Sequence, residues 1–428
     1  MLNGALVIVI AIVAYYFIIF SKKVKKSVTT LLLSIILYIF NPVNTLTLEN
    51  IGKIISFETL GILFGMMIIV EFLKESGFFT FSAVWVIKAS KAKFWAALFS
   101  LMLITALFSA FLDNLITILF ISPIIFLITD TLEIDAAPFI MLTIFIDNIG
   151  GMSTLIGSPL NIVLGSISKL DFTQFMKIMS VIAFITFIST FTIFRKKYTK
   201  AQTAEFSEKL KRLSNMKPEK AITNKKLLLI SIIVFALVLT GFIFSSAIKI
   251  NSALIAVFGG LILLFVFNHD FASFSSRIDW DTMFFYAGLF SISYALDKIG
   301  VTQSIAWIFK PLIGAPVILM LCFMWLSAFV IPFLSAVPGT LLLAPVVKIL
   351  IGYGAPTELW YAYAVGANLG SNFTPLGAVQ NIVGVSLLEK HGGKSLSFSQ
   401  FMNYSKKTFL VSLILGTFFV LGLYFVKF

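Results

Sequence analysis

The chain has 428 residues, of which 59% are hydrophobic and 12% are charged, and its mean hydropathy is +1.03. This composition excludes an ordinary soluble domain and indicates a multi-pass protein of the cell membrane, with the lipid bilayer as its main surroundings. The net charge of +13 then reflects a bias of Lys and Arg toward one membrane face, and no nucleic-acid partner is expected. One cysteine and two histidines leave no basis for a protein-held metal site, so no resident cofactor is expected.

Apolar runs of about 20 residues, long enough to cross a bilayer, follow one another along the chain. The first run is followed rather than preceded by lysines, the reverse of a secretory signal peptide, so we expect a retained span with its N-terminus outside. Ten full spans are expected, near 4–20, 28–42, 57–74, 138–165, 172–194, 227–246, 250–268, 280–297, 358–388 and 405–427. Two further apolar pairs occur at 94–112 with 115–131 and at 316–332 with 336–350. Each pair is either a re-entrant hairpin or two crossing helices, because both choices return the chain to the side of the membrane from which the pair started.

Segment 195–226 contains eleven Lys or Arg against three Glu and no apolar run that could span. The positive-inside bias makes it a cytoplasmic linker and puts both termini outside. The halves that it separates, 1–194 and 227–428, repeat each other: ISFETLGILFGMM aligns with IDWDTMFFYAGLF, and FIDNIGGMSTLIGSPLN with NLGSNFTPLGAVQN. An odd number of spans per half inverts the second copy, an architecture typical of secondary transporters with a site at the midplane.

The stretch FIDNIGGMSTLIGSPLN, residues 145–161, predicts a membrane helix that breaks between Ser153 and Pro159. Its glycines permit backbone conformations that other residues resist, and proline cannot donate a backbone hydrogen bond. A break leaves free N–H groups that suit an anion and free carbonyl groups that suit a cation. A matching break is expected at Gly370–Gly377. The alternative, two merely kinked spans, is disfavoured because the two motifs occupy symmetric positions.

Two acidic residues of the first half are candidates for chemistry. Asp113 lies with Asn114 at the turn of the first apolar pair, where a carboxylate is functional if it is in mid-membrane and ordinary if it ends a span. Asp147, just before the first break, either binds an ion or pairs with a neighbouring amide. The matching positions of the second half are Ser335 and Ala367, so the acidic residues favour one half.

These motifs resemble those of the ion transporter superfamily, and particularly its arsenite permease, D-type sodium/proton antiporter and melanosomal P protein branch, related to the divalent anion:sodium symporters. The resemblance is carried by SAFLDNLITILFISP, NIGGMSTLIGSPLN, ISFETLGILFGMM, and WYAYAVGANLGSNFTPLGAVQN followed by EKHGGKSLSFSQFMNY, and it covers nearly the whole chain after the first span. It implies an all-α fold with two re-entrant hairpins and two broken helices, a scaffold beside a moving transport domain, an elevator-like motion and a homodimer.

The residue pattern and the resemblance together place the site on the hairpin turns and the two breaks. Substrate contacts are expected from Asn114, Thr117, Ser153, Thr154, Ser158, Asn161, Ser335, Thr340, Asn368, Ser371, Asn372, Thr374 and Asn381. The coupling ion, a proton or Na⁺, is expected at Asp113, Asn114, Asp147, Gly151, Gly157, Gly370 and Gly377. No enzyme is expected, because GGKS at 392–395 lacks the glycine and strand of a phosphate-binding loop, and HExxH and GxSxG are absent.

The expected function is secondary active transport of a small anion or oxyanion, arsenite-like or carboxylate, coupled to a proton or sodium gradient. The P protein branch commonly has GDPPN where this chain has GSPLN, and Asp-Asn where it has Ser335-Ala336. Losing those carboxylates weakens the alternative of sodium/proton antiport and leaves neutral hydroxyls suited to an anion. A passive channel is the alternative of another class, and it would dissipate its own gradient without accumulating substrate.

Overall fold

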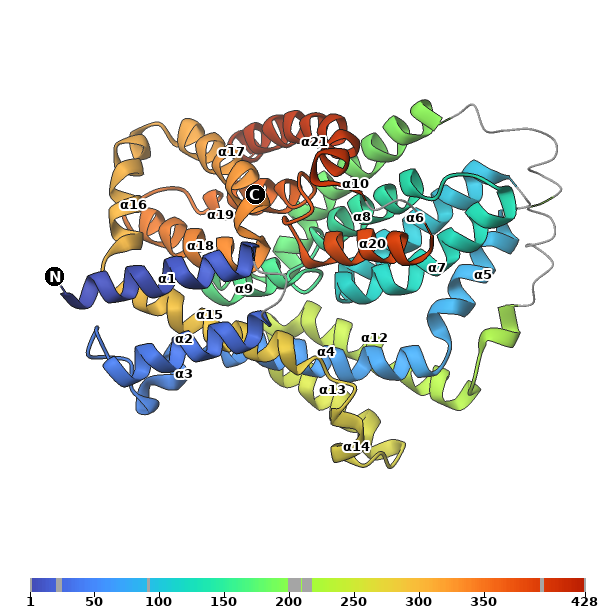
Figure 1. Ribbon diagram of the computed structural model, residues 1–428, viewed down its shortest axis with the longest axis horizontal. Helices are drawn as coiled ribbons and strands as arrows, with labels where there is room; N and C mark the ends of the chain where they lie inside the picture. The colour runs from blue at the N-terminus through green and yellow to red at the C-terminus, as the bar shows by residue number, and fades with distance from the viewer. Residues whose placement is uncertain are drawn as a thin grey trace.

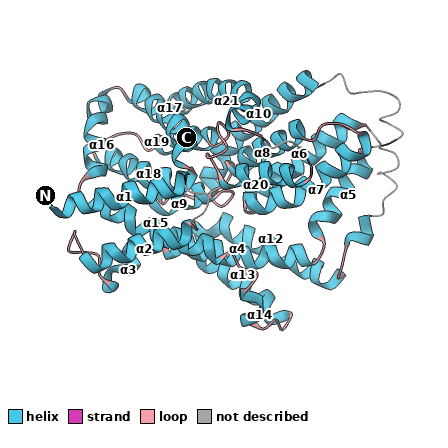
Figure 2. Ribbon diagram, viewed as in Figure 1, coloured by secondary structure: helices cyan, strands magenta, loops and turns pink. Residues whose placement is uncertain are grey.

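The computed structural model describes residues 2–20, 25–90, 93–198, 209, 218–392 and 396–426. All regular structure in these residues is helical (Figure 2), which confirms the all-α class expected from composition. Most of the linker expected at 195–226 lies outside the described residues. The limits of the two halves, 1–194 and 227–428, therefore stay a prediction.

Helices of the first half follow the expected order of three spans, a helical pair, a broken span and a last span. They are α1 (Leu2–Phe20), α2 (Lys26–Phe40), α4 (Phe57–Glu75), the pair α6 (Phe94–Phe111) and α7 (Asn114–Leu132), the broken span α8 (Ala137–Gly151) and α9 (Pro159–Ser168), and α10 (Phe172–Tyr198). Shorter elements connect them: η1 (Leu48–Asn50), α3 (Ile51–Ile54) and α5 (Phe78–Ala89).

Helices of the second half repeat this order. They are α12 (Lys225–Ile248), α13 (Ser252–Val266), α15 (Trp280–Lys298), the pair α17 (Pro316–Leu334) and α18 (Ala336–Gly352), the broken span α19 (Leu359–Gly370) and α20 (Val379–Lys390), and α21 (Phe398–Val426). The short connections are η3 (Pro218–Ala221), α14 (Phe271–Ser275), α16 (Val301–Phe309) and η4 (Lys310–Gly314). Each of the ten expected spans thus corresponds to one helix or to one broken pair.

Fewer helices qualify as spans by length and composition alone. Among the described residues, six helices are long and apolar enough to cross a membrane, or seven if the bent pair Leu48–Ile54 and Phe57–Glu75 is one span. Three of the six, α6, α7 and α17, are arms of the helical pairs. The broken spans do not qualify because each half-helix is too short, at 15 and 10 residues in α8 and α9. The count of ten therefore rests on adding half-helices and shorter apolar helices.

Each helical pair returns to the end of the molecule from which it started, as a re-entrant hairpin does. The ring of Phe94, the first residue of α6, lies 5.6 Å from the ring of Phe139, which follows α7 in the first turn of α8. At the other pair, Lys310 Nζ, at the start of η4 before α17, lies 4.9 Å from the ring centroid of Tyr353, just after α18. The two hairpins lie toward opposite ends of the long axis (Figure 1).

The broken helices cross between the hairpins. In the first half, α8 packs on its own hairpin helix α6, whereas α9 packs on α18 of the other hairpin. In the second half, α19 packs on its own α17, whereas α20 packs on α7. This exchange is the contact pattern of two copies related by an inverted two-fold axis. Since every residue of α8 and of α19 is buried, the breaks lie within protein, where irregular backbone is tolerated at membrane depth.

A second group of helices lies beside this crossed assembly (Figure 1). In it, α2 packs on α15 and α4 packs on α13, and α12 packs on both α4 and α13. The exposed face of α12 and α13 is apolar, with Leu237 64% and Phe258 68% exposed, which suits contact with lipid. Glycines allow the closest of these packings: a Cβ added at Gly65 of α4 would lie 2.2 Å from the backbone of Ala256 in α13.

Candidate functional site

A cavity of about 260 Å³ lies where the hairpin tips, the breaks and the second helix group meet. Four helices begin at it, because its lining includes the first residues or N-caps of α7, α9, α18 and α20. The polar side chains in its lining that come from the tips and breaks are Asp113, Asn114, Asn148, Ser158, Ser335, Asn368, Ser371 and Gln380. The partial positive charges of four helix N-termini therefore converge on one small space.

Neutral amides and hydroxyls make up most of this polar lining. Asp113 is the one carboxylate that the tips and breaks contribute to the cavity wall in the described part of the chain, and its side chain accepts a hydrogen bond from the Leu115 amide at the start of α7. The Ser158 hydroxyl caps α9 by accepting a hydrogen bond from the main-chain N–H of Asn161. The start of α20, where residues 378–380 line the cavity, has no side-chain cap. This combination favours an anionic ligand.

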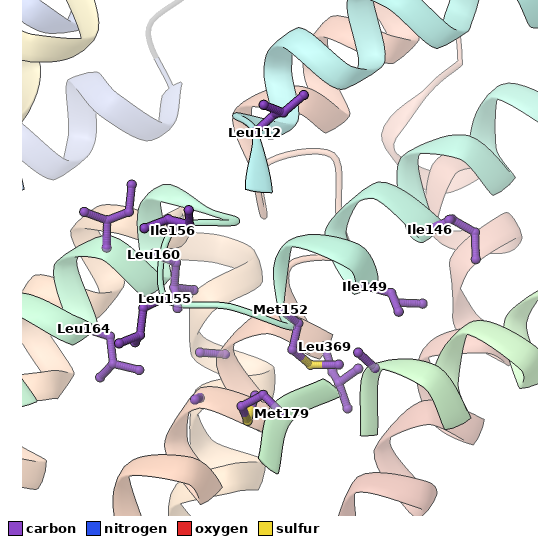
Figure 3. Close-up of a cluster of buried hydrophobic side chains, with 14 of the residues drawn as sticks. Leu112, Ile146, Ile149, Met152, Leu155, Ile156, Leu160, Leu164, Met179 and Leu369 are labelled. Carbon is purple, nitrogen blue, oxygen red and sulfur yellow. The ribbon is translucent and has the colours of Figure 1, made fainter. Parts of the chain in front are cut away.

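Two side chains hold the first break: one ties it to the hairpin, and the other satisfies its free carbonyl groups. Thr154 donates its hydroxyl to the Ala110 carbonyl of the first hairpin. The Asn161 amide Nδ2 donates to the carbonyls of Gly151 at 3.0 Å and Thr154 at 2.9 Å, across the break. Apolar side chains of Met152, Leu155 and Ile156 lie around this loop (Figure 3). The irregular backbone is thus paired internally, as burial requires.

The second break repeats these contacts. Thr374 donates to the Pro332 carbonyl of the second hairpin. The Asn381 amide Nδ2 donates to the carbonyls of Ser371 at 2.7 Å and Thr374 at 2.9 Å. The Thr and Asn that recur in both motifs therefore perform the same task in both halves.

The two breaks are joined by reciprocal amide hydrogen bonds. Asn148 of α8 donates to Asn381 Oδ1 at 2.9 Å, and Asn368 of α19 donates to Asn161 Oδ1 at 2.9 Å. Asn148 also accepts from Gln380 Nε2 at 2.6 Å. Because these partners are more than 200 residues apart in the chain, the network fixes one half of the molecule against the other.

Glycines of the breaks serve close packing rather than unusual backbone angles, which corrects the reason given for them from the sequence. The glycines with positive φ among the described residues are Gly77, Gly300, Gly354 and Gly392, and none of these is in a break. A Cβ at Gly157 would instead lie 2.6 Å from the Gly151 carbonyl oxygen, and one at Gly377 would lie 2.4 Å from the Ser371 carbonyl oxygen. Any larger residue would push the break apart.

The structure divides the residues expected from the sequence into two sets. Cavity-lining residues are Asp113, Asn114, Ser158, Ser335, Asn368 and Ser371. Residues buried behind the lining are Thr117, Asp147, Thr154, Asn161, Thr340, Asn372, Thr374 and Asn381, with the glycines Gly151, Gly157, Gly370 and Gly377. Ser153 is partly buried and lies outside the cavity wall.

Gln380, Tyr286 and Asp279 are polar lining residues that were not expected from the sequence. Gln380 adjoins the recurring Asn381, and a polar residue at the start of a half-helix was the signal that could have identified it. Tyr286 of α15, 4% exposed, and Asp279, the N-cap of α15, come from the second helix group. Nothing local in the sequence marks them, because only packing brings α15 to the hairpin tips.

The mouth of the cavity faces the end of the molecule where the basic linker joins. Its lining includes Lys74 and Arg277, which pair with Glu71 at 3.0 Å and Glu75 at 2.7 Å. The backbone beside Glu75 also accepts hydrogen bonds from Thr223, which follows the linker segment. The positive-inside rule predicts that this is the cytoplasmic end, and the orientation stays a prediction.

The ends of α9 and α4 are joined at the opposite end of the molecule. Lys169, which follows α9, forms an ion pair there with Glu58 in the first turn of α4. The cavity thus opens toward the linker end, while an ion pair ties the crossed helices to the second helix group at the other.

Comparison with known proteins identifies the family. The sequence profile described as citrate transporter matches residues 15–366. A 46 kDa membrane protein of Mycobacterium leprae is 30% identical over 368 residues, 85% of each chain, and the human P protein is 27% identical over 88% of this chain and 54% of its own. The crystal structure of the Alcanivorax borkumensis YdaH transporter has the same fold, with a TM-score of 0.65, 14% identity and 99% coverage of both chains. The chain therefore belongs to the citrate transporter family and is a multi-pass membrane protein of the secondary transporter class.

Proposed function

We propose that the protein is a secondary active transporter that carries a small anion, a carboxylate or an oxyanion, through the cavity between the hairpin tips. The observation that carries the proposal is the convergence of four helix N-termini on a space where the polar side chains from the tips and breaks are mainly neutral amides and hydroxyls. Helix N-termini stabilise anions, and amides and hydroxyls can donate to carboxylate or arsenite oxygens. The family description, citrate transporter, supports a carboxylate as the first substrate to test.

The coupling cation is proposed to bind behind the cavity, between the first hairpin tip and the first break. A Cβ at Gly157 would lie 2.6–2.9 Å from the carbonyl oxygens of Gly151, Ser109 and Ala110. A Cβ at Gly151 would lie 2.7 Å from Asn114 Oδ1. Oxygen atoms that converge in this way fit a small hard cation such as Na⁺, and the Asp113 carboxylate at the same tip adds negative charge. The residues present therefore fit the proposed coupling ion.

Transport is proposed to follow an elevator-like motion in which the crossed helices move against the scaffold formed by α1, α2, α4, α12, α13 and α15. The two hairpin tips and both breaks share one hydrogen-bonded assembly, so they are expected to move together. Contacts between that assembly and the scaffold are fewer and include the exposed pair of Lys169 and Glu58. A homodimer, formed through scaffold helices, stays part of this proposal.

Purified protein in sealed proteoliposomes tests the function. Labelled citrate and arsenite are offered separately under an imposed pH gradient, an imposed sodium gradient or neither. Concentrative uptake of one anion that requires a cation gradient supports the proposal. Uptake of an anion that only equilibrates across the membrane indicates a channel. Sodium movement driven by a pH gradient without any anion indicates sodium/proton antiport. This second candidate function is supported by the two acids Asp113 and Asp147. Asp113→Asn should abolish gradient-driven accumulation, and intact accumulation in this variant would exclude the coupling role of Asp113.

A further inference from the structure

The carboxyl group of Asp147 is isolated inside the protein. Its side chain is 0% exposed, and the one hydroxyl close enough to act on its carboxyl group, that of Ser109, donates instead to the main-chain carbonyl of Asp147. An ionised carboxylate without partners at membrane depth is among the most costly arrangements in a protein. The same position in the second half is Ala367, so the fold does not need a carboxylate there.

The polar groups that act on the Asp147 carboxyl are the Ser109 hydroxyl and one further acid. Ser109 of the first hairpin donates to the main-chain carbonyl of Asp147 and lies within 3.0 Å of Asn114 Oδ1. Helices α6, α7, α10, α19, α20 and α21 pack against α8. Of the described residues on these helices, the one charged group that acts on the Asp147 carboxyl is Asp113, at the start of α7. No described cation compensates a negative charge on Asp147.

We infer that Asp147 is a proton-binding site of the transport cycle, occupied and closed off by the first hairpin in the conformation described here. This inference rests on the proposed function for the movement of an anion, and it adds a coupled proton at Asp147 to the cation proposed beside Gly157. A proton needs one acceptor oxygen, whereas a metal ion needs several oxygen ligands, and the one side-chain oxygen that acts as a hydrogen-bonding neighbour of the Asp147 carboxyl is that of Ser109. Asp113 lines the cavity, but Asp147 lies behind it.

The proton step involves one O–H bond and no change of oxidation state. When the hairpin tip at Ser109 moves away from α8, water reaches Asp147, its O–H bond breaks, and the proton leaves to that water. Before the hairpin closes again, a hydronium ion gives a proton back to the carboxylate and becomes water. The hairpin then closes over the neutral carboxyl group, the crossed helices move, and reopening on the opposite side of the membrane releases the proton to water there. Closure over an ionised Asp147 is unfavourable, because the closed pocket has no partner for the charge. Proton binding thereby controls whether the hairpin can close.

Infrared difference spectroscopy on purified full-length protein tests the site without any substrate. At neutral pH the spectrum of the wild type should contain the carbonyl band of a protonated carboxyl group. The spectrum of Asp147→Asn should lack this band, so the band should appear in the difference between the two spectra. Asp113→Asn and the exposed control Asp130→Asn should keep it. Ser109→Ala, which leaves the carboxyl in place, should shift the band. A spectrum that is the same in Asp147→Asn as in the wild type would overturn the inference.

Transport measurements separate this inference from the proposed function. In proteoliposomes, Asp147→Asn should lose accumulation of labelled citrate driven by a pH gradient, and Asp130→Asn should retain both this accumulation and citrate counterflow. If Asp147→Asn accumulates citrate under a pH gradient as the wild type does, Asp147 does not carry the coupled proton. If wild-type protein shows no counterflow of any tested anion, the proposed function fails, while the infrared band still decides the proton site.

Discussion

Replacing Gly150 by alanine should force the first broken helix away from its hairpin. A Cβ at position 150 would lie 2.4 Å from the carbonyl oxygen and 2.6 Å from the Cα of Ala106 in α6. Because ordinary contact begins at 3.4 Å and the obstructing atoms are backbone, the two helices must separate by about 1 Å, the difference between 3.4 and 2.4 Å. No side-chain rotation can relieve this contact.

The expected loss of stability follows from two opposing terms. Overpacking of this kind costs ~1–3 kcal/mol. Replacing a helical glycine by alanine returns up to ~1 kcal/mol of helix propensity. Gly422 of α21 gives the matched control, since a Cβ there meets nothing within 4 Å and only the favourable term remains. Gly150→Ala should therefore be less stable than Gly422→Ala by roughly 1–3 kcal/mol, although the chemical change is identical.

Thermal unfolding of both variants in one detergent measures this difference, and citrate counterflow in proteoliposomes measures its effect on the site. The midpoint of Gly150→Ala should fall below that of the wild type, and that of Gly422→Ala should stay level or rise. Citrate counterflow should fall in Gly150→Ala and not in Gly422→Ala. The reason is that Ala106 lies one helical turn before the hairpin residues that contact the first break, so a shift at Ala106 displaces them. Equal midpoints in the two variants would show that the helix contact is not as tight as described.

Three further outcomes are expected. Ser335 has φ 70° and ψ 152°, a backbone conformation that is almost confined to glycine and costs another residue ~1–3 kcal/mol. Ser335→Gly should therefore raise the unfolding midpoint, while the affinity for the anion falls because the hydroxyl is lost. A lower midpoint would contradict the backbone strain. Asn161→Ala should cost ~1–3 kcal/mol for each carbonyl left without a donor, at Gly151 and Thr154, and unchanged unfolding would refute it. Lys169→Gln should change the free energy of unfolding by less than ~1 kcal/mol, because the ion pair of Lys169 with Glu58 is partly exposed. The same substitution should speed substrate exchange. An unchanged exchange rate would show that the ion pair stays intact during transport.

Sequence alone determined the class of protein, the order of its helices and the location of both breaks. The breaks expected at Ser153 to Pro159 and at Gly370–Gly377 lie between the ends of α8 and α9 and of α19 and α20. These features depend on local properties: the length of apolar runs, the missing N–H of proline and the charge of the linker. The repeat within the chain further showed which positions recur, and the recurring Thr and Asn perform matching tasks in both breaks.

Only the tertiary structure decided which of those polar residues face the cavity. Asn161 and Asn381 were expected to contact substrate, but each spans its own break and binds an asparagine of the other half, behind the cavity wall. Gln380 and Tyr286 reach the cavity because α20 and α15 pack against elements distant in the chain. Side-chain direction across such contacts is set by the crossing of the two halves, and no local pattern within either half contains it.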